Sequence, residues 1–132
     1  IMDTIIEKDR ENMEIIAKSD NDYPVLMINQ NRYLKGEFPN GELYSKWRSI
    51  NKKMISEVKG KIIWSLKVEA PYLINGNLEP LDEILAYWYP SHKAFLSMIN
   101  SPHRKDNFEL RKKLIVFAVI HRCDGRDIPL IK

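Results

Sequence analysis

The 132-residue chain is 44% hydrophobic and 30% charged. This length and composition predict one domain with a packed core, and they exclude wholesale disorder and a need for disulfide staples. The single cysteine, Cys123, excludes an internal disulfide and a cysteine-based metal site. The net charge of +3 is small, so the clustered lysines and arginines are expected on solvated helix faces and not on a nucleic-acid-binding surface.

No segment predicts a contact with a membrane. No apolar run approaches the length of a membrane span, and the N-terminal segment IMDTIIEKDREN is too acidic for a signal peptide. We therefore expect a cytoplasmic protein.

The first expected elements are a helix and a short strand. Residues 3–18 predict a helix, because Thr4 and Glu7 have the spacing of a capping box and an apolar stripe follows them. The apolar run 25–28 predicts a buried strand, and residues 35–41, with one proline and two glycines, predict a loop.

Residues 42–58 carry the clearest helical pattern, with apolar side chains three or four positions apart. Gly60 stands where a residue in the left-handed conformation commonly ends a helix. Alternating side chains over 61–74 predict the second strand, with a bend or an edge position at Pro71. Asn75-Gly76 predicts a turn after it.

Residues 83–89 and 114–121 predict two further strands, both apolar on either face. Between them, Ser91 can cap a helix that buries Phe95 and its apolar neighbours, and residues 103–112 can add a second short helix.

The order strand, helix, strand, strand, helix, strand predicts an α+β fold. It is the ferredoxin-like βαββαβ sandwich, a four-stranded antiparallel sheet with helices on one face. Residues 1–22 are expected to form an N-terminal helical extension, and residues 23–132 the sheet domain. The uncovered sheet face would be apolar, and a second copy is its simplest cover, so we expect a homodimer through the sheet faces. The side chains expected there are Val116, Ala118 and Ile120, or Leu85, Tyr87 and Tyr89.

Four sequence motifs follow one another between residues 23 and 122. They are Met27-Ile28-Asn29 with Arg32-Tyr33; Lys59-Gly60-Lys61-Ile62-Ile63-Trp64; Leu81-Asp82; and Tyr89-Pro90-Ser91 with Ala94-Phe95, Met98 and Pro102. In these motifs the chain resembles the DUF1330 family of uncharacterised proteins, within the dimeric α+β barrel superfamily. The last motif is the most specific one.

This resemblance implies a dimeric barrel with one pocket in each subunit. Relatives in the superfamily use such a pocket for cofactor-free oxygenation, isomerisation or haem chemistry. The matching positions that carry polar or aromatic side chains are Asn29, Arg32, Trp64, Asp82 and Arg111.

Three positions depart from the family pattern. Arg104 stands where the family often has tyrosine, and Leu110 precedes Arg111 where it often has histidine. Phe117-Ala118-Val119 stands where the last strand often begins Asp-Ser-Arg. The polar groups of the family pocket are thus largely replaced by apolar ones.

No catalytic motif is present, and none of the three histidines has an orienting carboxylate by spacing. His92 is expected to be solvated in a first helical turn, His103 to lie in a loop, and His121 to end the last strand. We expect no metal and no cofactor.

Asn29 is the strongest single candidate for a ligand contact. It follows the apolar run and by alternation shares a face with Val25 and Met27. Its amide either bonds to the backbone at the strand end, which is commoner, or faces a cavity. In the second case Trp47 and Trp64 would form the walls of the cavity, although such aromatic residues more often belong to a core or a dimer interface.

The candidate ligand-binding residues are therefore Asn29, Arg32, Trp47, Trp64 and Arg111. The first functional hypothesis is a protein that binds a small apolar or aromatic molecule between sheet and helices. The alternative is a non-catalytic dimeric scaffold or binding protein with a filled core. An RNA-binding role ranks last, because the strand 83–89 lacks the glycine and basic residue of an RNA-recognition motif. Whether the protein is an enzyme stays open.

Overall fold

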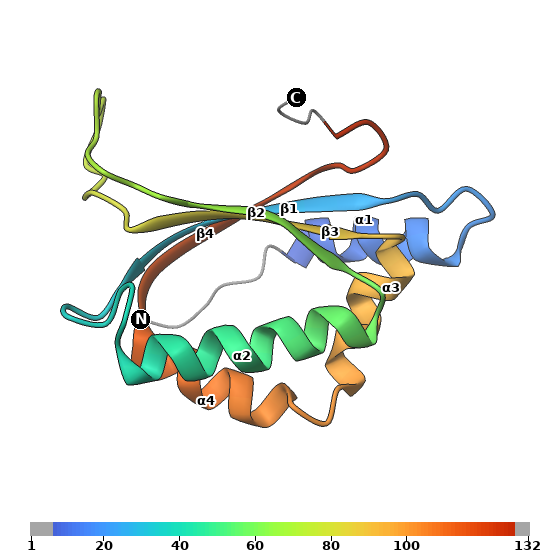
Figure 1. Cartoon of the computed structure of the whole chain (residues 1–132). Helices are drawn as coiled ribbons and strands as arrows, with labels where there is room; N and C mark the ends of the chain where they lie inside the picture. Colours follow the sequence, from blue (N-terminus) through green and yellow to red (C-terminus); the bar gives the residue numbers. More distant parts are fainter. Residues whose placement is uncertain (1–6, 129–132) are drawn as a thin grey trace.

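The computed structural model describes residues 7–128, and it has the ferredoxin-like α+β fold expected from the sequence. Its elements in chain order are α1 (Glu7–Lys18), β1 (Val25–Tyr33), α2 (Glu42–Glu57), β2 (Lys61–Lys67), β3 (Glu83–Tyr89), α3 (His92–Leu96), the 3-10 helix η1 (Ser97–Asn100), α4 (Arg104–Leu114) and β4 (Ile115–Asp124). The antiparallel sheet has the strand order β2-β3-β1-β4. Helices α2 and α4 lie together beneath one face of it (Figure 1).

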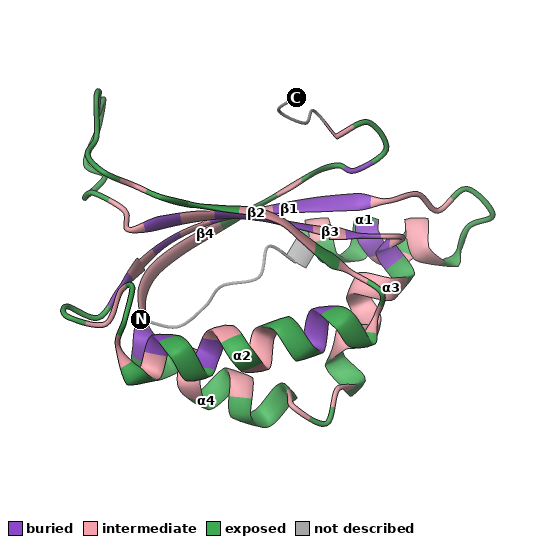
Figure 2. Cartoon of the chain, viewed as in Figure 1, coloured by how far each residue is buried: buried purple, intermediate pink, exposed green. Residues whose placement is uncertain are grey.

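The register of the strands decides which side chains face these helices. Val25 and Met27 of β1 lie opposite Tyr89 and Tyr87 of β3. Together with Leu85 they pack against α1 and α2 in the main core of the molecule. The resulting purple stretches of β1 and β3 stand out in Figure 2.

Five of the six expected interface residues therefore lie on the helix side of the sheet, and the sixth, Val116, falls at a register shift of β4 and has no strand partner in the register. Leu85, Tyr87 and Tyr89 belong to the core, and Ala118 and Ile120 lie opposite Asn31 and Asn29, on the helix side. Alternation separates the two faces of a strand, but it does not say which face meets the helices when both are apolar.

The opposite face carries the other alternating set, and we call it the open face. It is largely apolar, and most of its side chains are half-buried. Its apolar members are Leu26, Ile28, Trp64, Leu66, Ile84, Ala86, Trp88, Phe117 and Val119, and polar residues such as Gln30 and Arg32 share the face.

Three strands differ in length from their expected bounds, and one of them, β4, runs over Ile115–Asp124 instead of residues 114–121. β1 runs on to Tyr33, because Asn29 and Asn31 continue its buried alternation. β2 ends at Lys67 instead of residue 74. The Val68 amide still donates to the Asp82 carbonyl at 2.9 Å, which closes the ladder.

The segment that follows, residues 69–80, is exposed throughout, and we call it the arm. It extends from the sheet on the side away from α2 and α4 (Figure 1). Gly76, in the expected turn, has a φ of 119°, which suits glycine. Apolar side chains are exposed along the arm, among them Tyr72 and Leu73.

Gly60 is not the residue in the left-handed conformation that was expected after α2. Lys59 is the residue with positive φ, at 63°. A Cβ at position 60 would lie 2.8 Å from the Ile55 side chain and 3.0 Å from the Trp88 carbonyl oxygen. Glycine therefore serves the close approach of α2 to β3.

The N-terminal helix packs against the sheet through Met13, and Asp9 pairs with Arg122 of β4 at 2.6 Å. The expected capping role of Thr4 lies outside the described residues. Between residues 7 and 128, no helix has the length and apolar character needed to cross a membrane.

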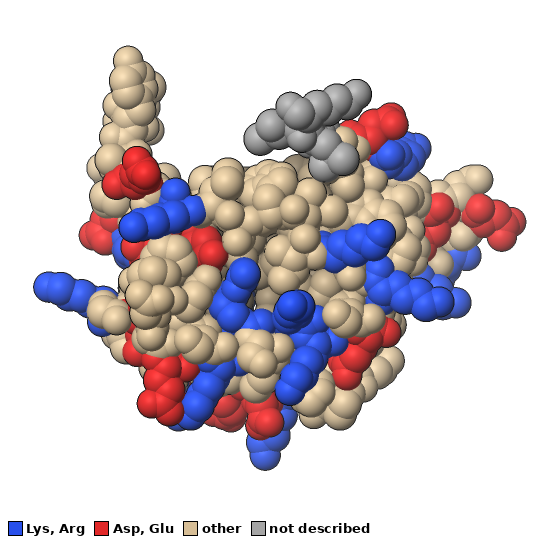
Figure 3. All heavy atoms as spheres, in the orientation of Figure 1, with Lys and Arg blue, Asp and Glu red and all other residues tan. Residues whose placement is uncertain are grey.

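The basic clusters on α2 and α4 lie on solvated helix faces, as expected, whereas Lys59 precedes β2 and Lys61 is its first residue. Lys52 and Lys53 of α2 and Lys105 and Lys112 of α4 are exposed. Figure 3 shows Lys and Arg interspersed with Asp and Glu over the lower part of the molecule, where α2 lies.

Candidate functional site

A buried carboxylate lies between the sheet and α2. Glu83, the first residue of β3, is 3% exposed and faces the helices. Tyr33 donates its hydroxyl hydrogen to Glu83 Oε1 at 2.6 Å, and the Tyr44 hydroxyl lies 2.9 Å from both carboxylate oxygens. Such donors offset the large cost of removing a carboxylate from water.

The phenols are held in their donating form. Burial raises the pKa of Tyr33 and of Tyr44, and the hydrogen bonds to Glu83 raise it further. Burial also raises the pKa of Tyr87 to about 12, and its hydroxyl accepts a hydrogen bond from Asn51 Nδ2 at 2.9 Å. These hydroxyls therefore stay protonated at neutral pH.

Three polar atoms around Glu83 are buried without a hydrogen-bond partner among the described residues: Asn31 Oδ1, Trp47 Nε1 and Arg48 Nη1. Arg48 Nη1 lies 4.0 Å from Glu83 Oε2. Asn31 Nδ2 donates to the Tyr33 hydroxyl at 3.1 Å, and the ring of Trp47 is 5.8 Å from that of Tyr33. Buried polar atoms without a hydrogen bond are uncommon in folded proteins, so these three atoms indicate a candidate site.

These residues come from three elements, and we call Asn31, Tyr33, Tyr44, Trp47, Arg48 and Glu83 the Glu83 cluster. Alternation along β1 points Asn31 and Tyr33 to the helix side. One turn of α2 carries Tyr44, Trp47 and Arg48. Asn31 and Glu83 are paired across the sheet, so the polar groups meet at the end of the sheet from which the arm extends.

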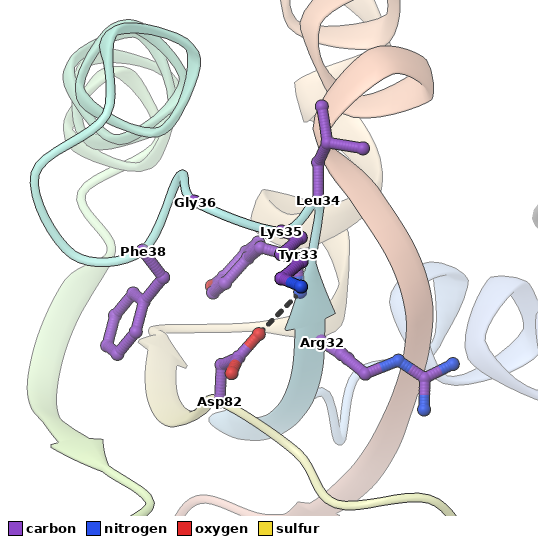
Figure 4. A pocket seen from close by; sticks show the side chains of 7 residues that line it. All are labelled: Arg32, Tyr33, Leu34, Lys35, Gly36, Phe38 and Asp82. Atoms are coloured by element: carbon purple, nitrogen blue, oxygen red, sulfur yellow. Dashed lines mark hydrogen bonds between the residues drawn. The ribbon is translucent and has the colours of Figure 1, made fainter.

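A surface hollow of about 270 Å³ adjoins the cluster. Its lining residues are Arg32, Tyr33, Leu34, Lys35, Gly36, Phe38 and Asp82 (Figure 4). Asp82 Oδ2 accepts a hydrogen bond from the Tyr33 amide at 2.8 Å. The ring of Phe38 stacks on Tyr33 at 5.5 Å and meets the ring of Tyr44 edge-on at 5.1 Å. Phe38 and Tyr33 thus belong both to the hollow and to the aromatic packing around Glu83.

The residues expected to bind a ligand do not all meet. Asn29 and Trp47 are buried on the helix side, and Asn29 Nδ2 donates to the Met27 carbonyl at 3.3 Å. Trp64 pairs with Ala86 and therefore lies on the open face. A register shift between Ile62 and Trp64 changes the alternation of β2, and this shift overturns the expectation that Asn29 and Trp64 share a cavity.

Arg32 lies apart from Asn29 as well, on the other face of β1. Arg32 points to the open face, where it pairs with Glu79 of the arm at 2.5 Å and lies over the ring of Phe117. Arg111 is half-buried on α4.

The sequence did contain a signal for the missed residues. Asn31 and Tyr33 follow Asn29 at intervals of two, and Glu83 has the parity of Leu85, Tyr87 and Tyr89. Polar side chains that alternate in step with the buried apolar ones could have been predicted to lie on the same face of the sheet. Tyr44 and Arg48 carry no comparable signal, because polar residues are common on an amphipathic helix.

His92 also differs from expectation, since it is fully buried. Its Nδ1 lies 3.0 Å from Asp22 Oδ1 and 2.9 Å from the Tyr23 carbonyl oxygen. Asp22 also accepts hydrogen bonds from the amides of His92 and Lys93, so it fastens the first turn of α3. Across residues 7–128 no cluster of three or more His, Cys, Asp or Glu side chains could hold a metal ion.

No protein-family model matches the chain, and no curated protein matches it either. Among solved structures the chain is similar to RPA0582, a protein of unknown function from Rhodopseudomonas palustris. The two are 23% identical with a TM-score of 0.72 over 98% of this chain and 97% of the other. The crystal structure of methylated RPA0582 gives a TM-score of 0.73 at 23% identity, over 99% and 96% of the two chains. At this identity the likeness shows the fold alone.

Proposed function

We propose that the chain is a DUF1330-like protein that binds a small apolar or aromatic molecule between the sheet and α2, at the Glu83 cluster. The observation that carries the proposal is the set of buried atoms without a hydrogen bond, Asn31 Oδ1, Trp47 Nε1 and Arg48 Nη1, beside a buried carboxylate. Ligand sites combine apolar walls with a few polar groups of this kind. The rings of Tyr33, Phe38, Tyr44 and Trp47 supply the walls.

The adjoining hollow supports a route of entry. Its volume of about 270 Å³ is just below the range typical of drug-sized ligands, roughly 300–1,000 Å³. A ligand of about one ring therefore fits, and it would reach the polar atoms by displacing the ring of Phe38.

Ligand screening by thermal unfolding tests this function. We expect some small aromatic compounds to raise the melting temperature of the wild type, because a ligand stabilises the state to which it binds. Arg48→Met should remove most of that stabilisation, since it deletes a polar group of the cluster.

Lys52→Met is the matched control, because Lys52 lies one turn further along α2 and is exposed. It should respond to ligands as the wild type does. Equal stabilisation of both variants, or no ligand at all, would contradict the proposed site.

A homodimer through the open face is a second proposal, and it is also the basis of the alternative function as a dimeric scaffold. Its support is the apolar character of the open face, on the side of the sheet opposite α2 and α4. Apolar faces of this size mark interaction surfaces. Light scattering coupled to gel filtration should give about twice the chain mass of 15.6 kDa, and a monomer at micromolar concentration would contradict the dimer.

A further inference from the structure

We infer that the ligand of the Glu83 cluster is a neutral aromatic amide or lactam, with a carbonyl oxygen next to an N–H group. This inference rests on the proposed binding function and specifies the chemistry of the ligand. It follows from the charge of the cluster, from its unpartnered donors and acceptor, and from its aromatic walls.

The charge balance of the cluster favours a neutral ligand. The carboxylate of Glu83 and the guanidinium of Arg48 lie 4.0 Å apart and carry opposite charges. The other members are neutral: the hydroxyls of Tyr33 and Tyr44 stay protonated, and the side chains of Asn31 and Trp47 carry no charge. A charged ligand would add an uncompensated charge to a buried site, which is costly.

The unpartnered atoms define the polar end of the ligand. Trp47 Nε1 and Arg48 Nη1 are hydrogen-bond donors, whereas Asn31 Oδ1 is an acceptor. A carbonyl oxygen has two lone pairs and can accept from both donors. A neighbouring N–H group can donate to Asn31, so an amide carries both the acceptor and the donor that these three atoms lack.

The assignment of the Asn31 amide is set by its own partner. Its Nδ2 donates to the Tyr33 hydroxyl, and this hydroxyl donates its hydrogen to Glu83. A carboxylate accepts only, so the direction of donation along this chain is fixed and Oδ1 is left as the free atom. The ligand must therefore offer a donor at this position.

The remainder of the ligand should be a flat ring. Tyr33, Tyr44 and Trp47 lie with ring centres 5.1 to 6.1 Å apart, and Phe38 adds a fourth ring. Aromatic rings favour offset or edge-on contact with one another, and this preference selects an aromatic over an aliphatic amide.

Four matched probes test the inference: benzamide, benzoate, acetophenone and toluene. Binding to the full chain is measured by calorimetric titration at neutral pH. Benzamide should bind at least about tenfold more tightly than the other three. Benzoate carries a charge, acetophenone lacks the donor, and toluene lacks both polar groups.

Trp47→Phe keeps a ring but removes the Nε1 donor, and it should weaken benzamide binding by about tenfold. Trp64→Phe is the matched control on the open face and should leave binding unchanged. The indole N–H signals in a nitrogen–proton NMR spectrum give an independent readout. Benzamide should shift the signal that disappears in Trp47→Phe, and it should leave the Trp64 signal in place.

The outcomes separate this inference from the proposed function. Tighter binding of benzoate or acetophenone, or equal binding of toluene, would overturn the amide assignment. The amide assignment would also be overturned if screening found a different ligand whose binding needs Arg48 but is unchanged by Trp47→Phe. In that case the proposed binding function would still stand. If Arg48→Met and Lys52→Met respond alike to every ligand, the proposed function falls and the inference falls with it.

Discussion

Glu83 owes its place under the sheet to groups that are remote in sequence. Tyr33 and Tyr44 donate to its carboxylate, and both rings pack against Phe38. The side chain of Arg48 supplies the nearest opposite charge. Because each hydroxyl is fixed by ring packing, the cluster is preorganised, and the loss of one donor leaves an unsatisfied buried partner.

Tyr33→Phe should therefore destabilise the fold. The change removes one donor to Glu83 and the acceptor of Asn31 Nδ2, and an unsatisfied buried group costs about 1–3 kcal/mol. Urea denaturation measures the free energy of unfolding. The control is Tyr72→Phe, because Tyr72 is fully exposed on the arm. Equal stability of the two variants would show that the bond contributes nothing.

Alkaline pH should weaken the fold through the buried tyrosines. Burial raises the pKa of Tyr87 to about 12, and it also raises the pKa of Tyr33, Tyr44 and Tyr89 above their ordinary value of 10.0. The unfolded chain releases these protons first as pH rises. The contribution of these protonated tyrosines to the free energy of unfolding is thus complete below about pH 10, and it is lost as pH rises toward 12.

Urea denaturation over this range of pH should show a steady fall in the free energy of unfolding. Tyr87→Phe should make that fall shallower, whereas Tyr72→Phe should follow the wild type. A free energy that does not change above pH 10 would contradict the prediction.

Single residues were predictable from the sequence only where local alternation decides their direction. Asn29 was placed on the correct face, because β1 is regular from Val25. Trp64 was not, since a register shift in β2 changes its face. The burial of His92 depends on Asp22, 70 positions away in the chain, and spacing alone cannot reveal such a contact.

At the scale of elements, Asp22 joins the loop after α1 to the start of α3. Its carboxylate accepts hydrogen bonds from the amides of Tyr23, His92 and Lys93 and contacts the His92 ring. Burial raises the pKa of Asp22, but these hydrogen bonds outweigh that effect, so its pKa lies below the ordinary value. Ser91 is the N-cap residue of the same helix, and its Oγ accepts a hydrogen bond from the Ala94 amide at 3.0 Å.

Asp22→Ala should lower the free energy of unfolding by about 1–2 kcal/mol, the usual range for a lost helix cap. Asp20→Ala is the control, because Asp20 lies exposed in the same loop. Chemical denaturation at neutral pH measures both. The difference in the free energy of unfolding between the wild type and Asp22→Ala should shrink as pH falls below about 3.8. Protonation of Asp22 in the wild type removes the same interactions that the substitution removes. A difference that persists in acid would point to packing instead of charge.

Elements with one strong pattern were predicted almost to the residue. The bounds of β3 were correct, and the Ser91 cap was confirmed. β1 was predicted too short, because the buried side chains in its second half are polar and the apolar pattern of a strand is missing there. β2 was predicted too long, because Val68 to Ile74 is apolar in composition although the chain leaves the sheet after Val68.

At the scale of the whole molecule, the open face sets the expected assembly. Val119 and Ile120 are neighbours in β4 that point to opposite sides: Val119 lies opposite Gln30, and Ile120 lies opposite Asn29. Val119 belongs to the open face, while Ile120 is 47% exposed on the helix side.

Val119→Asp should dissociate the proposed dimer, because an unpaired charge in an apolar interface costs several kcal/mol. A rise of about a hundredfold or more in the dissociation constant is expected. Ile120→Asp should leave the dimer intact. Sedimentation velocity across a dilution series measures both variants, and equal behaviour of the two would argue against an interface on the open face.

The arm has a consequence for how the chain holds together. A protease that cuts between Tyr72 and Leu73 would leave one piece with β1, α2 and β2, and a second with β3, α4 and β4. In the order β2-β3-β1-β4 every neighbouring pair joins the two pieces, and no pair lies within one piece. The strands of the two pieces therefore alternate across the sheet. A nicked chain should stay assembled without a covalent link, and neither piece should form a sheet when it is made alone.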